Sequence, residues 1–288
     1  MTKRSEVDEL LRRIAEQFDA LPRQQQSVAR YVEQQRTTLM VQRINEVAEG
    51  AGVHGSAVVR FAQRLGFSGY SEMQALFRSE HTAQATPARS YQQRIRRVIE
   101  GEPERMAPAQ MALRFIDASR VGLDELAGEF DGKSFEVAVE MLAKADTIYV
   151  VAVRRAFSIA SYIAYALQHT QKRVQLVNGL GGMYREQMRS IGKNDVLIAI
   201  SFPPYGKETL YCARLASQHK AKVLAITESA LGPLARHASV LLKVREGSAF
   251  AFRALTSTIC LCQALFVALA YKLELTVEET SPPGEYDD

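Results

Sequence analysis

Apolar residues in the first 80 positions recur only at helical spacing. The pattern begins with Leu10, Leu11, Ile14, Phe18 and Leu21, and it resumes after Pro22 with Val28, Tyr31 and Val32. Because residues three and four apart share one face of a helix, we expect residues 1–80 to form a small all-helical domain. Ala, Gln, Thr and Arg then predominate, with Pro87, Pro103 and Pro108 among them. This change predicts a linker and a connecting helix over residues 81–129.

From residue 130 the pattern changes to short apolar, β-prone runs, each followed by a loop and a helical segment. The runs cover residues 147–152, 173–177, 195–200, 222–226 and 239–244. This alternation is typical of a parallel sheet with helices on both faces. We therefore expect an α/β domain over residues 130–273 with five parallel strands, a helix beginning near Pro233 and a long last helix at 252–273. A flexible acidic tail is expected at 274–288.

Two short helices separated by a tight turn are predicted within residues 44–65. Ile44, Val47, Ala48 and Ala51 form one apolar stripe that ends at Gly52, and Val58, Phe61, Ala62 and Leu65 repeat the spacing. Helices of this kind bury their stripes against each other in a helix-turn-helix arrangement. The second helix keeps a polar face that can donate to phosphates and base edges in a major groove, formed by His54, Ser56, Arg60, Gln63 and Arg64.

The composition is that of a globular protein of 288 residues, 47% hydrophobic and 24% charged. We expect no membrane span and no signal peptide, and hence a cytoplasmic protein. Cys212, Cys260 and Cys262 lack Cys-x-x-Cys spacing, and the 5 histidines are scattered, so we expect no disulfide framework, metal site or cofactor. The net charge of +4 is too small to argue for nucleic acid by itself.

Basic and hydroxyl side chains follow three of the predicted strands. They are Arg154, Arg155 and Ser158 after the first strand, Ser201, Tyr205 and Thr209 after the third, and Thr227 and Ser229 after the fourth. The carboxyl ends of parallel strands meet at one edge of a sheet, where helix N-termini attract anions. We therefore predict a sugar-phosphate site formed by these loops.

Residues 44–70 resemble the N-terminal domain of the RpiR family of bacterial transcriptional regulators. The resemblance is most specific at Val58-Val59-Arg60-Phe61, Arg64-Leu65-Gly66-Phe67 and Gly69-Tyr70, which match the family's recognition helix and the hairpin after it. His54 stands where the family usually has a capping Ser, and Ala57 replaces a frequent Thr.

Residues 130–272 resemble the sugar isomerase (SIS) domain, the usual partner of that DNA-binding domain. The resemblance implies an αβα sandwich whose Ser/Thr-rich loops hold the phosphate of a phosphosugar, here through Ser158, Ser201, Thr209, Thr227 and Ser229. The loop from Ser201 to Thr209 is longer than the family's and contains two prolines. Glycines expected in the first loop are missing, and Arg154 and Arg155 can supply charge there instead.

Together the two resemblances imply a DNA-binding transcriptional regulator of carbohydrate metabolism without catalytic residues. Its partners would be double-stranded operator DNA, a phosphosugar effector and further copies of itself in a homodimer or homotetramer, with no membrane. One alternative is a phosphosugar isomerase, which would use Glu208 or Glu228 as its general base. Another is that the helical domain serves only for dimerisation.

Overall fold

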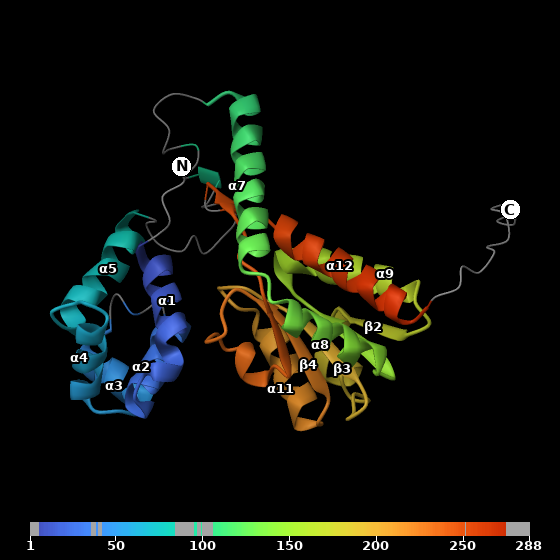
Figure 1. Ribbon diagram of the computed structural model, residues 1–288, viewed down its shortest axis with the longest axis horizontal. Coiled ribbons are helices and arrows are strands. Elements are labelled where there is room, and N and C mark those ends of the chain that lie inside the picture. Colours follow the sequence, from blue (N-terminus) through green and yellow to red (C-terminus); the bar gives the residue numbers. More distant parts are fainter. Residues whose placement is uncertain are drawn as a thin grey trace, which may run out of the picture. The chain divides into compact units, whose positions relative to one another are not determined.

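The computed structural model describes residues 6–35, 39, 42–83, 95–96, 99, 106–250 and 252–274. Residues 275–288 of the expected tail and most of the expected linker before residue 106 lie outside the described residues. The described N-terminal part is helical (Figure 1). Its elements are α1 (Glu6–Gln17), η1 (Phe18–Ala20), α2 (Arg23–Gln34), α3 (Ile44–Ala51), α4 (Gly55–Arg64) and α5 (Tyr70–Ala83).

Both ends of α3 are determined locally. Gly52 follows the helix with a φ of 66°, in the left-handed region that residues with a side chain rarely adopt. The N–H of Val53 then donates to the carbonyl of Ala48 at 2.9 Å. At the other end, the Glu46 carboxylate accepts a hydrogen bond from the N–H of Arg43. The turn to α4 therefore occurs at the position that the apolar spacing predicts.

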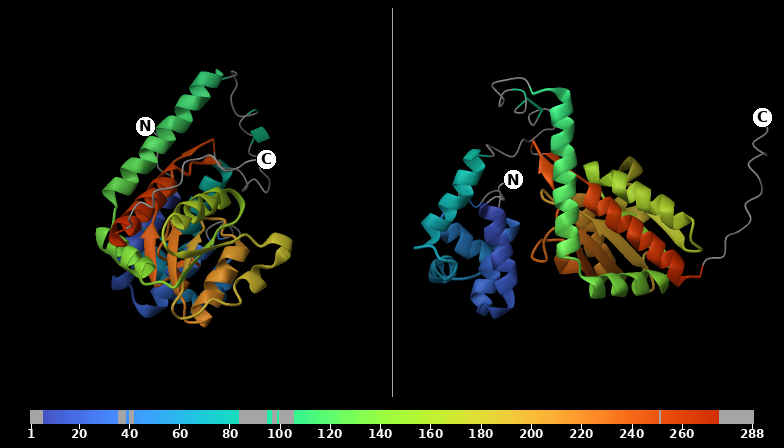
Figure 2. Two further views of the ribbon diagram at one scale, coloured as in Figure 1. Left: turned by 90° about the vertical axis from the view of Figure 1, so that its right-hand side faces the viewer. Right: turned by 45° about the horizontal axis from the view of Figure 1, so that its top comes forward.

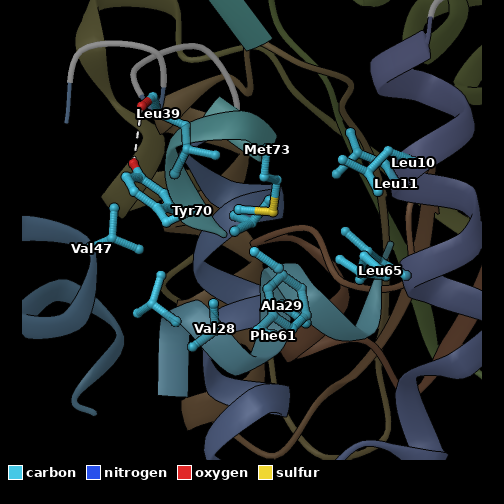
Figure 3. Close-up of a cluster of buried hydrophobic side chains, with 14 of the residues drawn as sticks. Leu10, Leu11, Val28, Ala29, Leu39, Val47, Phe61, Leu65, Tyr70 and Met73 are labelled. Atoms are coloured by element: carbon cyan, nitrogen blue, oxygen red, sulfur yellow. Dashed lines mark hydrogen bonds between the residues drawn. The ribbon is translucent and has the colours of Figure 1, made fainter. Parts of the chain in front are cut away.

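The N-terminal helices enclose one apolar core (Figure 3). Phe61 of α4, Val28 of α2 and Val47 of α3 are fully buried within it. Burying a side chain of this size stabilises a fold by about 1.5–3 kcal/mol. The repeated stripes of the two predicted helices thus face a common interior, as a helix-turn-helix requires.

Two side chains of α5 hold the segment before α3. The Tyr70 hydroxyl donates to the carbonyl of Gln42 at 2.8 Å, and the Gln74 amide donates to the carbonyl of Leu39 at 3.0 Å. A weaker bond from Tyr70 to Leu39 is drawn in Figure 3. These bonds satisfy carbonyls that no regular element pairs. They cross 28 and 35 positions of the chain, so the sequence pattern does not indicate them.

A five-stranded parallel sheet confirms the predicted α/β domain. Its strands are β1 (Thr147–Val151), β2 (Arg173–Val177), β3 (Val196–Ile200), β4 (Lys222–Thr227) and β5 (Val240–Lys243). Their order across the sheet is β2-β1-β3-β4-β5. Each strand lies within one residue of its predicted ends. Every residue of β3 is buried, as expected for a strand covered on both faces.

Helices cover both faces of the sheet and complete the expected αβα sandwich. They include α8 (Gly132–Ala143), α9 (Phe157–Gln168), α10 (Tyr184–Gln187), α11 (Lys207–Gln218) and α12 (Thr256–Lys272). Right-handed crossovers between parallel strands place α9 on one face and α10 and α11 on the other. The helix α12 lies beside α9 (Figure 1, Figure 2), and its Lys272 pairs with Glu140 of α8 at 2.8 Å.

The last helix begins later than the sequence predicts. Phe252–Arg253, expected to be helical, instead form β7, which pairs antiparallel with β6 (Ser248–Ala249). The helix α12 starts only at Thr256, where the Glu246 carboxylate accepts from the N–H of Ser257 at 3.2 Å. A carboxylate at this position accepts from an otherwise unpaired N–H group at the N-terminus of the helix and interacts favourably with the helix dipole.

The prediction of a helix beginning near Pro233 is also wrong. Residues 228–239, all of them described, contain only the 3-10 turn η5 (Ala235–His237). The N–H of Ser239 already donates to the carbonyl of Val223 in β4 at 2.8 Å. The described connection from β4 to β5 therefore forms a 3-10 turn instead of an α-helix.

The helix α7 (Pro108–Gly128) packs on the β6–β7 hairpin with no space between the two backbones. A Cβ added to Gly247 would lie 1.8 Å from the carbonyl oxygen of Ala118, and one added to Gly122 would lie 2.7 Å from the nitrogen of Gly247. Next to this contact, the hydroxyls of Ser119 and Thr256 hydrogen-bond at 3.0 Å. Only glycine fits at positions 122 and 247 without moving the backbone.

We predict that Gly247→Ala lowers the free energy of unfolding by about 1–3 kcal/mol, because overpacking against a backbone oxygen forces the helix and the hairpin apart. Urea unfolding followed by circular dichroism measures the change. Gly128→Ala is the matched control, since open space surrounds that helical position and its stability should not fall. Equal stability of Gly247→Ala and the parent chain would contradict the close contact.

Candidate functional site

The helix α4 turns three polar side chains outward. Ser56, Arg60 and Gln63 are exposed and, at about 100° per residue, fall on one narrow face. The Nε of Arg60 donates to the carbonyl of Ser56 at 3.3 Å, so the guanidinium lies along this face. The opposite face carries the buried residues Ala57, Val58, Phe61 and Ala62. The structure therefore brings three of the five predicted DNA contacts together.

The other two predicted contacts lie at the margins of this face. Arg64 is exposed and donates to the carbonyl of Ala20 at 3.4 Å. His54 is exposed immediately before the first turn of α4, and its side chain makes no capping hydrogen bond. This agrees with the poor capping expected of a histidine.

Two basic residues of the N-terminal helices were missed by sequence reasoning. Arg13 of α1 donates to the carbonyl of Leu65 at 3.1 Å and holds the end of α4 against α1. That contact crosses 52 positions, so no local signal exists for it. Arg43 is exposed immediately before α3. The sequence offered a signal for it, since Arg43 is a basic residue immediately before the predicted first helix of the helix-turn-helix pair.

The loop after β1 holds its basic residues in the 3-10 turn η3 (Arg154–Ala156). Arg154 is exposed and has a φ of 59°, whereas Arg155 is half-buried. A left-handed residue other than glycine costs about 1–2 kcal/mol. The hydroxyl of Ser158 donates to the carbonyl of Arg155 at 2.9 Å, so Ser158 stabilises the turn.

The loop after β3 contains one hydroxyl that shapes it and one that it leaves unpaired. Ser201 is buried, and its oxygen accepts from the N–H of Gly206 at 3.1 Å. Tyr205 is half-buried between them. Thr209 is fully buried, and its hydroxyl has no hydrogen-bond partner among the described residues. Ser201 therefore fixes the loop, while Thr209 retains its hydrogen-bonding capacity.

The loop after β4 begins with a buried hydroxyl and a shielded ion pair. Thr227 is fully buried, and within the described part of the chain its hydroxyl is unpaired. Glu228 pairs with Arg253 of β7 at 2.5 Å, with side-chain exposures of only 13% and 16%. The hydroxyl oxygen of Ser229 accepts from the N–H of Leu231 at 3.1 Å and closes the turn.

The register of the sheet places these three loops at one edge. In the parallel pairing, Val151 of β1 lies opposite Ala199 of β3, and Ile200 of β3 lies opposite Ile226 of β4. All three strands therefore end at the same level, and their following loops leave the sheet side by side. This is the edge at which α/β proteins usually bind their ligands.

Glu208 adds a negative charge to the first turn of α11. Its Oε2 is buried and finds no hydrogen-bond donor in the described residues. Burial, followed by the charge of Glu208, raises the pKa of the Tyr184 hydroxyl, and it raises the pKa of the Cys212 thiol to about 12. The sequence indicated Glu208 only as a candidate general base of the alternative enzyme. The burial of its Oε2 could not be predicted, because it arises from tertiary packing.

None of the helices in the described ranges is long and apolar enough to cross a membrane. The same residues contain no group of three or more His, Cys, Asp or Glu side chains that could hold a metal ion. The side chains named in the loops at this edge of the sheet carry hydroxyl, guanidinium and carboxylate groups.

Comparison with known families assigns both parts of the chain. The helix-turn-helix domain of the rpiR family matches residues 8–84, and the SIS domain matches residues 141–268. Fold and sites thus define a two-domain protein, with a helix-turn-helix domain followed by a SIS domain. The chain belongs to the RpiR family.

Solved structures share this fold at low sequence identity. The NanR protein of Vibrio vulnificus, complexed with ManNAc-6P, is 21% identical over 92% of each chain, with a TM-score of 0.52. The sugar isomerase domain of an RpiR transcription factor from Sphaerobacter thermophilus is 19% identical, covering 57% of this chain and 92% of that one, with a TM-score of 0.55. A proposed sugar-phosphate isomerase of Listeria monocytogenes is 15% identical, covering 60% of this chain and 95% of that one, with a TM-score of 0.51.

We predict that only one of the three cysteines reacts rapidly with Ellman's reagent in the native protein at pH 8. Cys260 is exposed, whereas Cys212 and Cys262 are buried. With a pKa of about 12, the Cys212 thiol stays protonated at this pH and is a poor nucleophile. Cys260→Ser should remove the rapid phase, and unfolding in guanidinium chloride should expose all remaining thiols. Rapid labelling of Cys212 in the native Cys260→Ser chain would contradict its burial.

Proposed function

We propose that this chain is a DNA-binding transcriptional regulator whose operator binding is controlled by a phosphosugar bound at the sheet edge. The observation that carries the proposal is the exposed face of Ser56, Arg60 and Gln63 on the second helix of an RpiR-type helix-turn-helix domain. The same chain continues into a SIS domain. We place this regulator in the cytoplasm, where it would act on genes of carbohydrate metabolism.

In this proposal α4 is the recognition helix and lies in the major groove of operator DNA. Arg60 and Gln63 read base edges, because they occupy the middle of the exposed face and carry several donors. His54, Ser56 and Arg64 contact the backbone on either side and fix the register of the helix on the duplex. Two copies of the domain in a homodimer or homotetramer would contact the two half-sites of an operator.

The effector site comprises the predicted residues of the three loops. Arg154 and Arg155 supply positive charge, Tyr205 lies in the loop after β3, and the buried hydroxyls of Thr209 and Thr227 are available to sugar oxygens. Three serines stabilise the loops through hydrogen bonds to the backbone: Ser158, Ser201 and Ser229. The presence of ManNAc-6P in the NanR complex supports a phosphosugar as the class of effector.

We assign no catalytic role and no cofactor to the chain. Glu228, one candidate base, is engaged by Arg253, and the attached helix-turn-helix domain has no evident use in an isomerase. The exposed polar face of α4 also argues against a domain that serves only for dimerisation. Self-association is supported by exposed apolar side chains on α7, Leu113 and Ile116 among them. We propose domain limits at residues 1–80, 81–129, 130–273 and 274–288.

Control of DNA binding needs a route from the effector loops to the chain that precedes the SIS domain. Glu228 follows the buried Thr227 and pairs with Arg253 of the hairpin. The hairpin in turn packs on α7 through the contact between Gly247 and Gly122. We propose that the effector shifts the β4 loop and that the shift reaches α7 through this ion pair and this close contact.

Arg60→Ala should weaken binding to a DNA duplex selected from a random library by about 5- to 150-fold, because it removes a base contact. Arg64→Ala should cost less, and mainly reduce the salt dependence of binding, because Arg64 contacts phosphate. Fluorescence anisotropy at several salt concentrations measures both. Arg189→Ala, an exposed arginine of the SIS domain, is the control. Unchanged affinity and salt dependence in both α4 variants would refute the recognition-helix assignment.

Arg253→Gln should uncouple effector binding from DNA binding, because it breaks the ion pair with Glu228. The active phosphosugar is first found by thermal-shift screening, since a ligand of the folded state raises the Tm. We expect the variant still to bind this phosphosugar. The change in operator affinity that the phosphosugar causes should be severalfold smaller in the variant than in the parent chain. Arg236→Gln, an exposed arginine of the same region, should respond as the parent chain does. A full response of Arg253→Gln would exclude the proposed route.

A further inference from the structure

The helix α7 has two apolar faces, and the described part of the chain covers only one of them. On the covered face the ring of Phe115 lies 5.9 Å from that of Phe250, and Ala118 and Gly122 are buried. These two are the buried residues among the 21 of α7, all of which are described. Helices are stabilised mainly by tertiary packing, so a helix of this length with so little burial requires a further contact.

A second apolar stripe runs along the exposed side of α7. Its positions are separated alternately by four and three residues, and they are Ala109, Leu113, Ile116, Arg120, Leu123 and Ala127. Leu113 and Ile116 are 59% and 61% exposed. At about 100° per residue, the stripe lies on the side of the helix opposite Ala118 and Gly122.

The spacing of this stripe is that of a coiled-coil seam. Met106 and Phe130 continue it just beyond the two ends of the helix, so it covers residues 106–130, more than three heptads. Apolar residues that alternate in this way face a second helix, because their period of 3.5 residues keeps them on one side of a supercoiled pair.

The charged position of the stripe, Arg120, indicates both the partner and its direction. In a parallel pair of α7 helices, the two Arg120 side chains would meet at the same level of the seam and repel each other. In an antiparallel pair centred at the level of residue 118, Arg120 of each helix lies opposite Ile116 of the other, next to its Asp117. Within one helix Arg120 already pairs with Asp117 at 3.5 Å. Charge complementarity therefore favours a second copy of α7 in the antiparallel direction.

The same antiparallel alignment matches the apolar side chains by size. It places Leu113 opposite Leu123 of the second copy and Ala109 opposite Ala127, large against large and small against small. A two-fold axis makes each of these contacts occur twice, so the stripe is complementary to itself.

We propose that α7 pairs with α7 of a second copy as an antiparallel two-stranded coiled coil. This inference deepens the proposed function and rests on it, since it names the contact that joins two copies of the regulator. The β6–β7 hairpin packs on the opposite face of the same helix. A shift of the hairpin that moves α7 would therefore reach both copies of the regulator.

Leu113→Glu tests the seam through the molar mass of the full chain, measured by sedimentation equilibrium. We expect the mass of the assembly to fall by half and the dissociation constant of the pair to rise by more than about 100-fold. The reason is that each pair would bury two carboxylates in place of two leucines. Val121→Glu is the matched control, because Val121 is an exposed apolar residue of α7 outside the stripe.

Arg120→Leu provides a second measurement if the charged variant does not fold, which circular dichroism establishes. It should strengthen the association, because a polar residue in a seam costs stability. A monomeric parent chain would overturn the proposal, and another segment of the chain would then be the occupant of the stripe. An unchanged mass of folded Leu113→Glu, or an equal loss of mass in Val121→Glu, would overturn it as well.

Cysteine cross-linking tests the direction of the pair in the Cys260→Ser background. Leu113→Cys combined with Leu123→Cys should form a disulfide between two copies under mild oxidation, because the antiparallel alignment brings these positions together. The two positions lie about 15 Å apart along one helix, so they cannot be joined within a copy. Rapid cross-linking of the single Leu113→Cys variant on a non-reducing gel would refute the antiparallel direction, as would a double variant that does not cross-link.

Binding to the selected DNA duplex separates a failure of this inference from a failure of the proposed function. If Leu113→Glu kept both the mass and the operator affinity of the parent chain, the pairing through α7 would be wrong and the regulator proposal would stand. If the parent chain selected no duplex from a random library, the regulator proposal would fail whatever the mass of the chain.

Discussion

The parallel pairing of β3 with β1 on one side and β4 on the other determines where all candidate ligand contacts lie. Side chains after residues 151, 200 and 226 are far apart in the chain, yet the register ends all three strands at one level. Every residue of β3 is buried, so a shift by one residue would exchange its two faces and disrupt the packing against both helix layers, which makes this register costly to change. The geometry of the sheet edge is therefore a consequence of the core.

Short-range patterns predicted the fold well. The turn at Gly52 and the strands follow from apolar spacing and from glycine's backbone freedom, which act over a few residues. The hairpin at residues 248–253 was not predicted, because its pairing depends on packing against α7 rather than on any alternation in its few residues. The bonds from Tyr70 and Gln74 to the segment before α3 were missed for the same reason, since they join distant positions.

The sequence indicates on which elements the candidate site residues lie, but not the state of each group. Sequence reasoning could not distinguish Ser201, which accepts from Gly206, from Thr209, whose hydroxyl is buried without a partner in the described chain. Sequence reasoning also could not distinguish the two candidate general bases, Glu208 and Glu228. Glu228 is neutralised by Arg253, whereas the charge of Glu208 is left to act on its neighbours. These differences depend on burial and on partners brought from elsewhere in the chain.

The close approach of α7 and the hairpin explains how a small movement at the sheet edge can have an effect beyond it. A loosely packed contact would absorb a displacement through side-chain rotation, but Gly247 meets the backbone of Ala118 with no side chain between them. A displaced hairpin must therefore either carry α7 with it or lose the contact altogether. The shielded ion pair of Glu228 and Arg253 joins the hairpin to the β4 loop with similar stiffness, because breaking it would leave two poorly solvated charges. Two connections that resist partial deformation favour a change between discrete arrangements, which is the behaviour that ligand control of DNA binding requires.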